Sequence, residues 1–269
     1  MSNTKTKLAW ILMGAATLVL RAVLSGHPEI VESYYSRGVF PILRWLIDYL
    51  FAWLPVPLIY PFLMGLIYFL VRKVAGWWRR GYPSLWKKGL DGLLGTAAFL
   101  GGGIFFFLVL WGFNYGRQPI EEQMGLELEP LSFSELKEEF NHEAEVIKRL
   151  RNQIPGATRE PISKDMLPEN LENKLRSELE NWLSQHGFST VGRVRGLYVY
   201  PKGVFLRFSS SGLYFPFTGE GHVDAGLHPL QKPYVMAHEL AHGYGFGDEG
   251  TCNFLGYLAC IQSEDPLIA

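Results

Sequence analysis

The chain has 269 residues, of which 48% are hydrophobic and 14% aromatic, and its formal net charge at pH 7 is -1. That length allows one or two domains. The near-neutral charge, with no basic C-terminal patch and no nucleic-acid-binding motif, argues against nucleic acid as a partner. Cys252 and Cys260 would lie ~12 Å apart on one helix, too far for a disulfide, so we expect two buried free thiols.

Three apolar segments in the first 116 residues each predict a membrane-spanning helix. They cover residues 8–24, 49–71 and 92–116, and the second and third contain no charged residue. Both exceed the ~20 residues that a spanning helix needs. In the first segment, Arg21 lies near the end, where its side chain can reach the membrane surface. Three prolines in the second segment indicate a helix that is kinked or begins later, namely Pro55, Pro57 and Pro61.

The distribution of cations predicts the orientation of these helices. The loop between the second and third segments carries six of them: Arg72, Lys73, Arg79, Arg80, Lys87 and Lys88. The positive-inside rule places this loop in the cytoplasm together with the N-terminus, so residues 117–269 would lie outside. A cleaved signal peptide over residues 1–25 is the alternative for the first segment, although no small-x-small cleavage site precedes Gly26.

Residues 117–269 have the mixed composition of a soluble α+β domain. A capping box at Ser132 and Glu135 predicts a helix over residues 132–150, and a leucine stripe predicts a second over residues 171–183. We expect both apolar stripes to pack in the core. Aromatic and β-branched runs then predict short strands, followed by a helix over residues 234–242. The strands are expected at 197–200, 204–208 and 212–218.

Residues 238–242 have the sequence HELAH, which matches the zinc-binding pattern HExxH. On a helix, His238 and His242 share one face and can bind one Zn²⁺. Glu239 lies beside that face, where its carboxylate can act as the general base on a zinc-activated water that attacks a peptide carbonyl. The neighbouring residues are apolar, so a metal would remove the cost of burying this polar trio.

A third zinc ligand is expected just after this helix. Glycines at positions 243, 245 and 247 allow a tight reversal, and Asp248 can cap the next helix. Glu249 would then lie in its first turn, opposite the two histidines. Asp248 is the weaker alternative as ligand. Asn253 lies four residues after Glu249 on the same face, where it could hydrogen-bond a ligating histidine.

This arrangement resembles the gluzincins, in which HExxH is followed by a second helix of the pattern Glu-x-x-x-Asn or Glu-x-x-x-Asp. The chain also resembles a family of uncharacterised bacterial membrane proteins with a C-terminal HExxH domain. Four stretches carry that resemblance: FNYGR at 113–117, YFPFTGEGHVD at 214–224, HELAHGYGF at 238–246 and NFLGYLAC at 253–260. It implies a zincin-like metallopeptidase in the bacterial cell membrane, without indicating a substrate.

The sequence departs from the gluzincin pattern in two places. Gly243 stands where a Gln is expected after the second histidine, and Gly250 and Thr251 stand where further acidic residues are expected. Glu249 still matches the ligand position. The zincin resemblance also implies that an edge strand above the zinc-binding helix pairs with an extended peptide, and residues 212–217 are the candidate.

Further polar residues near the motif are candidates for substrate binding or oxyanion stabilisation. Glu220 and His222 follow the expected edge strand, in what the pattern predicts to be a loop. Tyr257 and Tyr244 could donate to an oxyanion, although tyrosines on buried helices more often serve packing.

The sequence therefore predicts a membrane-anchored zinc metallopeptidase that acts on a peptide or protein substrate. A non-enzymatic membrane sensor or assembly protein with a structural zinc site is the alternative. A structural site fills all four positions with protein ligands, and only three good ligands are present here. An intramembrane protease ranks last, because the segment between Lys232 and Asp248 is too short and glycine-rich to span a membrane.

Overall fold

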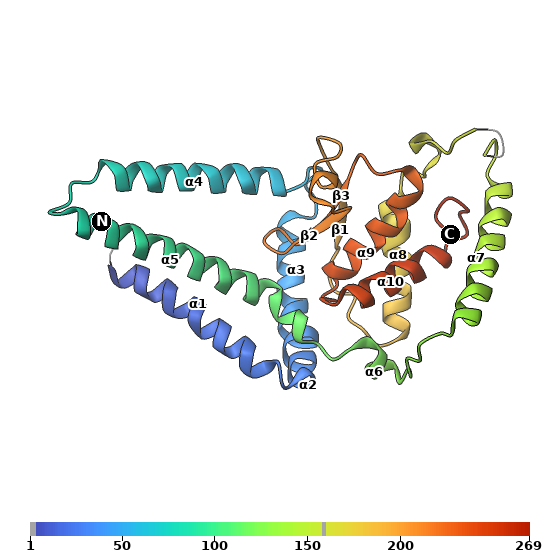
Figure 1. Cartoon of the computed structure of the whole chain (residues 1–269), viewed down its shortest axis with the longest axis horizontal. Coiled ribbons are helices and arrows are strands. Elements are labelled where there is room, and N and C mark those ends of the chain that lie inside the picture. The colour runs from blue at the N-terminus through green and yellow to red at the C-terminus, as the bar shows by residue number, and fades with distance from the viewer. Residues whose placement is uncertain (1–3, 158–159) are drawn as a thin grey trace.

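The computed structural model of the chain describes residues 4–157 and 160–269. Three long helices extend from one side of a compact part made of helices and a small sheet (Figure 1). The elements of the N-terminal half are α1 (Thr4–Leu24), α2 (Pro28–Ile30), a π-helical run η1 (Val31–Val39), α3 (Phe40–Phe51), α4 (Ile59–Arg79), α5 (Leu85–Leu110) and the 3-10 turn η2 (Gly112–Gly116). Those of the C-terminal half are α6 (Ile120–Met124), α7 (Phe133–Gln153), η3 (Lys164–Met166), α8 (Leu171–Gln185), β1 (Arg195–Val199), η4 (Leu206–Phe208), β2 (Gly212–Phe215), β3 (Glu220–Asp224), η5 (Pro229–Gln231), α9 (Lys232–Gly243) and α10 (Glu249–Ile261).

Within the described residues, three helices are long and apolar enough to cross a membrane, as the sequence predicts: α1, α4 and α5. The second helix begins later than its apolar segment, as the prolines indicate, and the predicted bounds of the third are wrong. The second begins at Ile59 rather than residue 49, because the chain leaves the helix at residues 52–58, which contain Pro55 and Pro57. The third begins at Leu85 and ends at Leu110, and the aromatic residues that follow it turn into η2.

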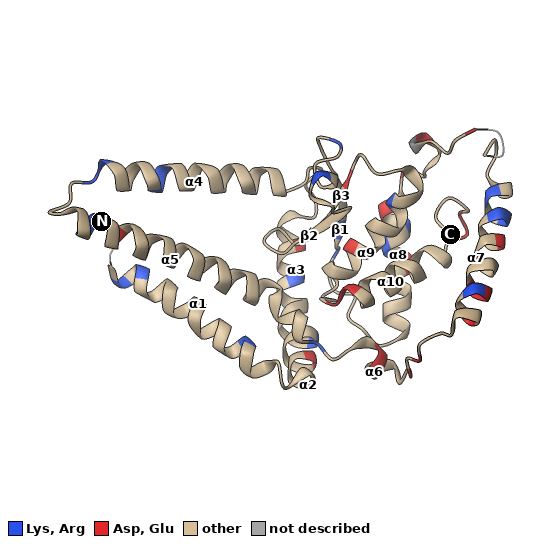
Figure 2. Cartoon of the chain, viewed as in Figure 1, with Lys and Arg blue, Asp and Glu red and all other residues tan. Residues whose placement is uncertain are grey.

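The membrane helices share one cationic end, opposite the compact part (Figure 2). Lys7 of α1 forms an ion pair of 2.6 Å with Asp91 of α5, and Arg80 approaches the same carboxylate to 3.1 Å. Trp77 of α4 donates a hydrogen bond of 3.1 Å to the carbonyl of Lys88. The N-terminus and the α4–α5 turn therefore lie on the same side, and the assignment of that side to the cytoplasm stays a prediction.

Residues 28–51 form a layer between the membrane helices and the compact part, which we call the interfacial platform (Figure 1). The sequence analysis did not predict it. Its helix α3 is amphipathic in an unusual sense, because buried Arg44 faces the compact part while Trp45 and Tyr49 are exposed on the other side. Trp45 and Tyr49 stack with ring centroids 5.4 Å apart. Exposed Trp and Tyr on the side away from the soluble part are typical of a membrane–water interface.

The sheet has three strands in the order β1–β3–β2, with β1 parallel and β2 antiparallel to β3. The predicted strand at 197–200 corresponds to β1, and the one at 212–218 to β2, which ends before Pro216 and lies at an edge as expected. The predicted strand at 204–208 is wrong. The Asp224 carboxylate accepts hydrogen bonds from the backbone N–H groups of Gly203, Phe205 and Leu206, which fold this segment into a turn. The sequence also missed the central strand β3.

Helices α8, α9 and α10 enclose the main core together with the sheet. The predicted helix at 171–183 is confirmed as α8, and Gly187 adopts a positive φ of 72° after its end, as a C-terminal glycine does. Helix α7 begins with the predicted capping box at Ser132. The expectation that its apolar stripe packs in the core is wrong, because α7 stands at the far edge of the compact part and Phe140 of the stripe is 71% exposed.

Candidate metal centre

Helix α9 carries the HELAH sequence and is packed closely on both sides. A Cβ on Gly221 of β3 would lie 2.7 Å from the Cβ of Glu239, and a Cβ on Gly256 of α10 would lie 3.2 Å from the backbone nitrogen of His238. Glycine at both positions therefore lets the sheet and α10 approach the helix that bears the histidines. This packing holds α9 in a fixed register between its two neighbours.

The glycine-rich turn after α9 explains the departure from the gluzincin pattern. A Cβ at position 243 would collide with the side chain of Val194, so a Gln has no room there. Gly245 has a φ of +88°, and a Cβ on it would lie 2.7 Å from the ring of Phe40 in the interfacial platform. Asp248 caps α10, as predicted, by accepting a hydrogen bond of 2.7 Å from the N–H of Thr251.

The structure brings His238, His242 and Glu249 together at the start of α10. The two histidine Nε2 atoms are 3.1 Å apart, and the Glu249 carboxylate oxygens lie 3.3 Å from Nε2 of His238 and 3.5 Å from Nε2 of His242. Ligands at 2.0–2.1 Å from a tetrahedral zinc are ~3.3 Å from each other. The two Glu249 distances are to different carboxylate oxygens, and one ligand atom from each of the three residues lies within 4.8 Å of the other two, close enough to hold one metal ion.

Both histidines are oriented by neighbouring groups. Nδ1 of His242 lies 2.8 Å from the carbonyl oxygen of Phe246 and donates to it, which leaves Nε2 as the free acceptor. Asn253 is in hydrogen-bond contact with His238, as the sequence suggests, and itself accepts a bond of 2.8 Å from the hydroxyl of Tyr234. Burial lowers the pKa of both histidines, which favours the neutral form that binds metal.

Glu239 lies in a slot between α9 and the edge strand β2. Burial raises its pKa to about 8, with a further increase from the charge of Glu249, and the backbone N–H of Tyr214 partly offsets both. Its Oε2 atom is buried and has no hydrogen-bond partner among the residues that the structure describes. Gly212 makes the slot possible, because a Cβ there would lie 2.5 Å from Glu239 Oε1.

A cavity of about 690 Å³ opens above these residues. Its walls include Phe107 and Trp111 at the end of membrane helix α5, and Tyr115 of η2. The indole of Trp111 donates a hydrogen bond of 2.8 Å to the carbonyl of His242. The sequence analysis did not select these three aromatic residues. Their position in the last part of the third apolar segment was the available signal, because it places them beside the emerging soluble part.

Glu220 and His222 do not line this cavity, so their position does not fit the expected role in substrate binding or oxyanion stabilisation. They lie on β3, where alternate side chains point to opposite faces, and the face that carries Gly221 is the one against α9. Glu220 instead forms an ion pair with Arg195 and accepts a hydrogen bond of 2.7 Å from the N–H of Leu58, at the N-terminus of α4. It therefore attaches a membrane helix to the sheet.

The two candidate tyrosines also lie away from the cavity. Tyr257 donates a hydrogen bond of 3.2 Å to Glu143 of α7, and Tyr244 is buried and donates to Glu180 of α8. Tyr257 falls two helical turns beyond Glu249, which places its hydroxyl beyond the cluster. Three other tyrosines line the cavity, namely Tyr115, Tyr214 and Tyr234. Burial raises the pKa of Tyr115, and the charge of Glu249 raises it further.

One protein-family model matches residues 35–269, from within the platform to the last residue of the chain. The chain belongs to the DUF3810 family. That family is described as a protein of unknown function, so the match bears out the expectation of an uncharacterised family and assigns no reaction. No curated protein and no solved structure matches the chain. The DUF3810 match begins inside η1, so the platform, α4, α5 and the metal centre belong to one family unit.

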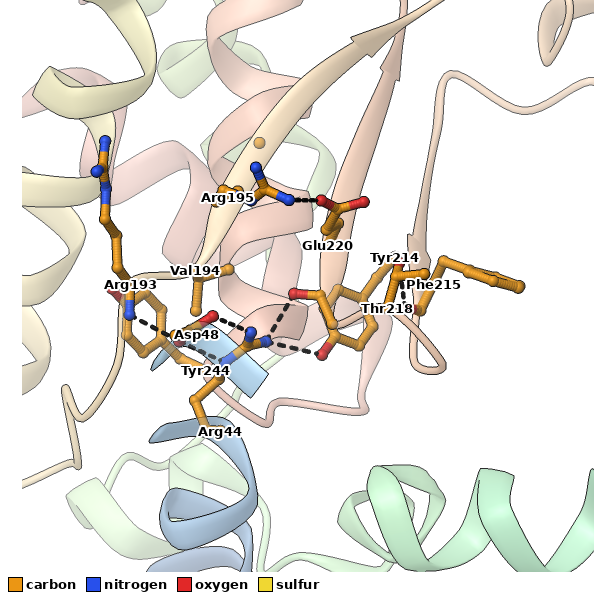
Figure 3. A network of polar contacts seen from close by, with 12 residues as sticks. Arg44, Asp48, Arg193, Val194, Arg195, Tyr214, Phe215, Thr218, Glu220 and Tyr244 are labelled. Atoms are coloured by element: carbon orange, nitrogen blue, oxygen red, sulfur yellow. Dashed lines mark hydrogen bonds and ion pairs between the residues drawn. The ribbon is translucent and has the colours of Figure 1, made fainter. Parts of the chain in front are cut away.

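Within this DUF3810 unit, a buried polar network joins the platform to the sheet (Figure 3). Arg44 forms an ion pair with Asp48, donates a hydrogen bond of 2.6 Å to the carbonyl of Gly219, and contacts the Tyr214 hydroxyl at 3.3 Å. Asp48 in turn accepts a bond of 2.7 Å from the N–H of Arg193. Since Tyr214 belongs to the strand beside Glu239, the platform supports one wall of the metal centre.

Proposed function

We propose that this chain is a membrane-anchored, zinc-dependent metallopeptidase with a zincin-like catalytic part. His238, His242 and Glu249 would hold the zinc, and Glu239 would act as the general base. One observation carries the proposal: three converging ligand residues share a cavity with a buried carboxylate oxygen that has no partner in the described chain. That combination of a three-ligand site and an available base supports catalysis over a purely structural site.

Each residue of the cavity has a step that it could perform. A bound zinc supplies Lewis acidity, which polarises a peptide carbonyl and makes water a better nucleophile. Glu239 Oε2 accepts the proton of the attacking water and delivers it to the departing amide nitrogen. The Tyr115 hydroxyl, which lines the same cavity, can donate a hydrogen bond to the carbonyl oxygen as negative charge develops there. The outer edge of β2 can pair with the backbone of an extended peptide.

A structural zinc in a sensor or assembly protein would need a fourth protein ligand. Cys252 is the nearest thiol, but its Sγ lies 3.3 Å from Nδ1 of His242 and 3.4 Å from the carbonyl of Phe246. It therefore contacts the side of the imidazole ring opposite the converging Nε2 atoms. No further His, Cys, Asp or Glu joins the cluster among the residues in the described ranges.

The proposal is tested by hydrolysis of a quenched-fluorescent library of randomised octapeptides with the zinc-loaded, full-length protein in detergent. We expect cleavage by the parent and a loss of about a hundredfold or more in Glu239→Gln, the size of a lost general base. Zinc content should be equal in both proteins. A Glu239→Gln variant as active as the parent would contradict the assigned base. A zinc-loaded parent that cleaves no peptide would favour the sensor.

A further inference from the structure

The length of the membrane helices places the metal centre at the membrane surface. At 1.5 Å per residue, a hydrocarbon core of ~30 Å takes ~20 helical residues. Counted from Lys88 at the cationic end of α5, that distance reaches Leu108 near the end of the helix. Helix α5 therefore leaves the hydrocarbon at the level of Phe107 and Trp111, which line the cavity.

The interfacial platform is independent evidence that the metal centre lies at the membrane surface. Its exposed aromatic residues Trp45 and Tyr49 lie on the face of α3 opposite buried Arg44, which bonds to the compact part. Tryptophan and tyrosine side chains are favoured at the level of the lipid headgroups. The platform therefore rests on the bilayer, and the metal centre lies directly above it.

Both membrane helices reach the walls of the cavity. Helix α5 contributes Phe107 and Trp111, and α4 contacts the opposite wall through Phe62, whose ring lies 5.1 Å from that of Phe215 and 5.5 Å from that of Phe217. Figure 1 shows α4 and α5 diverging toward the compact part. Their contacts through Phe69 and Phe99, and through Trp77 and Lys88, lie nearer the cationic end.

The lining of the cavity changes from apolar to polar along its length. Near the membrane helices it is formed by Phe107, Phe215, Pro216 and Phe217. The lining also includes Ser209 to Ser211, at the other end of β2 from Phe215, together with Glu249 and Asn253 of the metal centre. A fully soluble, polar peptide would not require an apolar lining of this kind. A substrate polypeptide that leaves the bilayer has an apolar segment in the membrane and a polar segment outside it, which matches the order of the cavity lining.

We propose that the substrate is a membrane-anchored polypeptide, cut in the extended segment directly outside its own transmembrane or lipid anchor. The anchor enters between the outer ends of α4 and α5, and the segment that follows pairs with β2 across the metal centre. This inference rests on the proposed peptidase function. It adds to it the position of the scissile bond relative to the membrane.

The depth of the site can be measured without activity. Single cysteines at Leu213 in the cavity wall, at Tyr49 on the platform and at Phe133 on α7 are labelled with a fluorophore in reconstituted vesicles. All three positions are exposed, whereas Cys252 and Cys260 are buried. A nitroxide on the lipid headgroup should quench the Leu213 and Tyr49 labels alike and spare the Phe133 label. Quenching at Leu213 as weak as at Phe133 would overturn the inference.

Cleavage then tests the substrate class. The zinc-loaded full-length protein in phosphatidylcholine vesicles receives one randomised decapeptide library in two forms, one coupled to a phospholipid anchor and one free. We expect the anchored form to be cut about a hundredfold faster, because anchoring raises the local concentration at a site that faces the bilayer. The Glu239→Gln variant should cleave neither form of the library.

The outcomes separate the two proposals. Equal rates on both forms would overturn the membrane-anchored substrate and leave the peptidase intact. Cleavage of the free form alone would do the same. If the zinc-loaded parent cuts neither form, the peptidase proposal fails and this inference fails with it, whatever the depth measurement gives.

Discussion

Replacing Arg44 with methionine should loosen the junction between the membrane platform and the sheet. The Arg44 side chain is 2% exposed, and that of its partner Asp48 is 9% exposed. Methionine keeps much of the aliphatic volume but leaves the Asp48 carboxylate buried with the N–H of Arg193 as its remaining donor in Figure 3. The Gly219 carbonyl and the Tyr214 hydroxyl each lose a donor as well.

The expected cost follows from the burial of the pair. Removing one partner of a buried ion pair typically destabilises a protein by about 3–5 kcal/mol, because the other charge stays uncompensated. For a protein of this size, 1 kcal/mol shifts the melting temperature by about 2–4 °C, so Arg44→Met should lower it by ~10 °C. The exposed Arg207→Met is the control, and its shift should be within ~0.5 kcal/mol of zero.

The assay is thermal unfolding of the detergent-purified protein, followed by tryptophan fluorescence at one fixed scan rate. A double variant, Arg44→Met with Asp48→Leu, should recover part of the loss, because it also removes the uncompensated charge. If Arg44→Met melts within 2 °C of the parent, a shift of the size seen for a surface change, the buried network is not what joins the platform to the sheet.

The remaining predictions concern the cavity. Gly212→Ala should abolish hydrolysis but keep zinc, since its Cβ would lie 2.5 Å from Glu239 Oε1; retained activity would contradict the slot. Tyr115→Phe should lower kcat by about tenfold to a thousandfold with little change in KM, as for a lost oxyanion donor, and an unchanged kcat would remove Tyr115 from the reaction. Cys260, whose pKa is raised to about 12 by burial, should resist alkylation at pH 8 until the protein unfolds; rapid labelling would contradict its burial.

The sequence was sufficient to predict those features whose structure depends on residues close together in the chain. His238, His242 and Glu249 come together because a helix, a glycine-rich turn and a capped second helix are consecutive, so local rules place all three side chains. The capping box at Ser132 was confirmed for the same reason. The cluster itself could therefore be expected before the fold was known.

Elements that depend on distant partners could not be predicted in the same way. Strand β3 contains Glu220, His222 and Asp224, which give it the polar composition of a loop. The strand can be buried because its charged side chains have partners. Glu220 pairs with Arg195 and accepts a hydrogen bond from the N-terminus of α4, and Asp224 accepts hydrogen bonds from the backbone of a turn. The fold alone supplies such partners.

The platform was hidden for a different reason. Its apolar residues run directly into those of the second predicted membrane segment, so hydropathy merges α3 with the chain that follows. The stripe of α7 shows the opposite case, since helical spacing indicates an apolar face but not what covers it. Tyr115 and Trp111 reach the metal centre only because the platform and α5 pack against α9.

Zinc content per chain tests the central claim most directly. The detergent-purified parent should contain about one zinc, as expected for one tetrahedral site, and Glu249→Ala should lose most of it. Asp248→Ala is the control, because this cap removes a helix hydrogen bond but no proposed ligand, and it should keep the zinc. A parent without metal, or a Glu249→Ala variant that retains its zinc while Asp248→Ala loses it, would contradict the proposed metal centre.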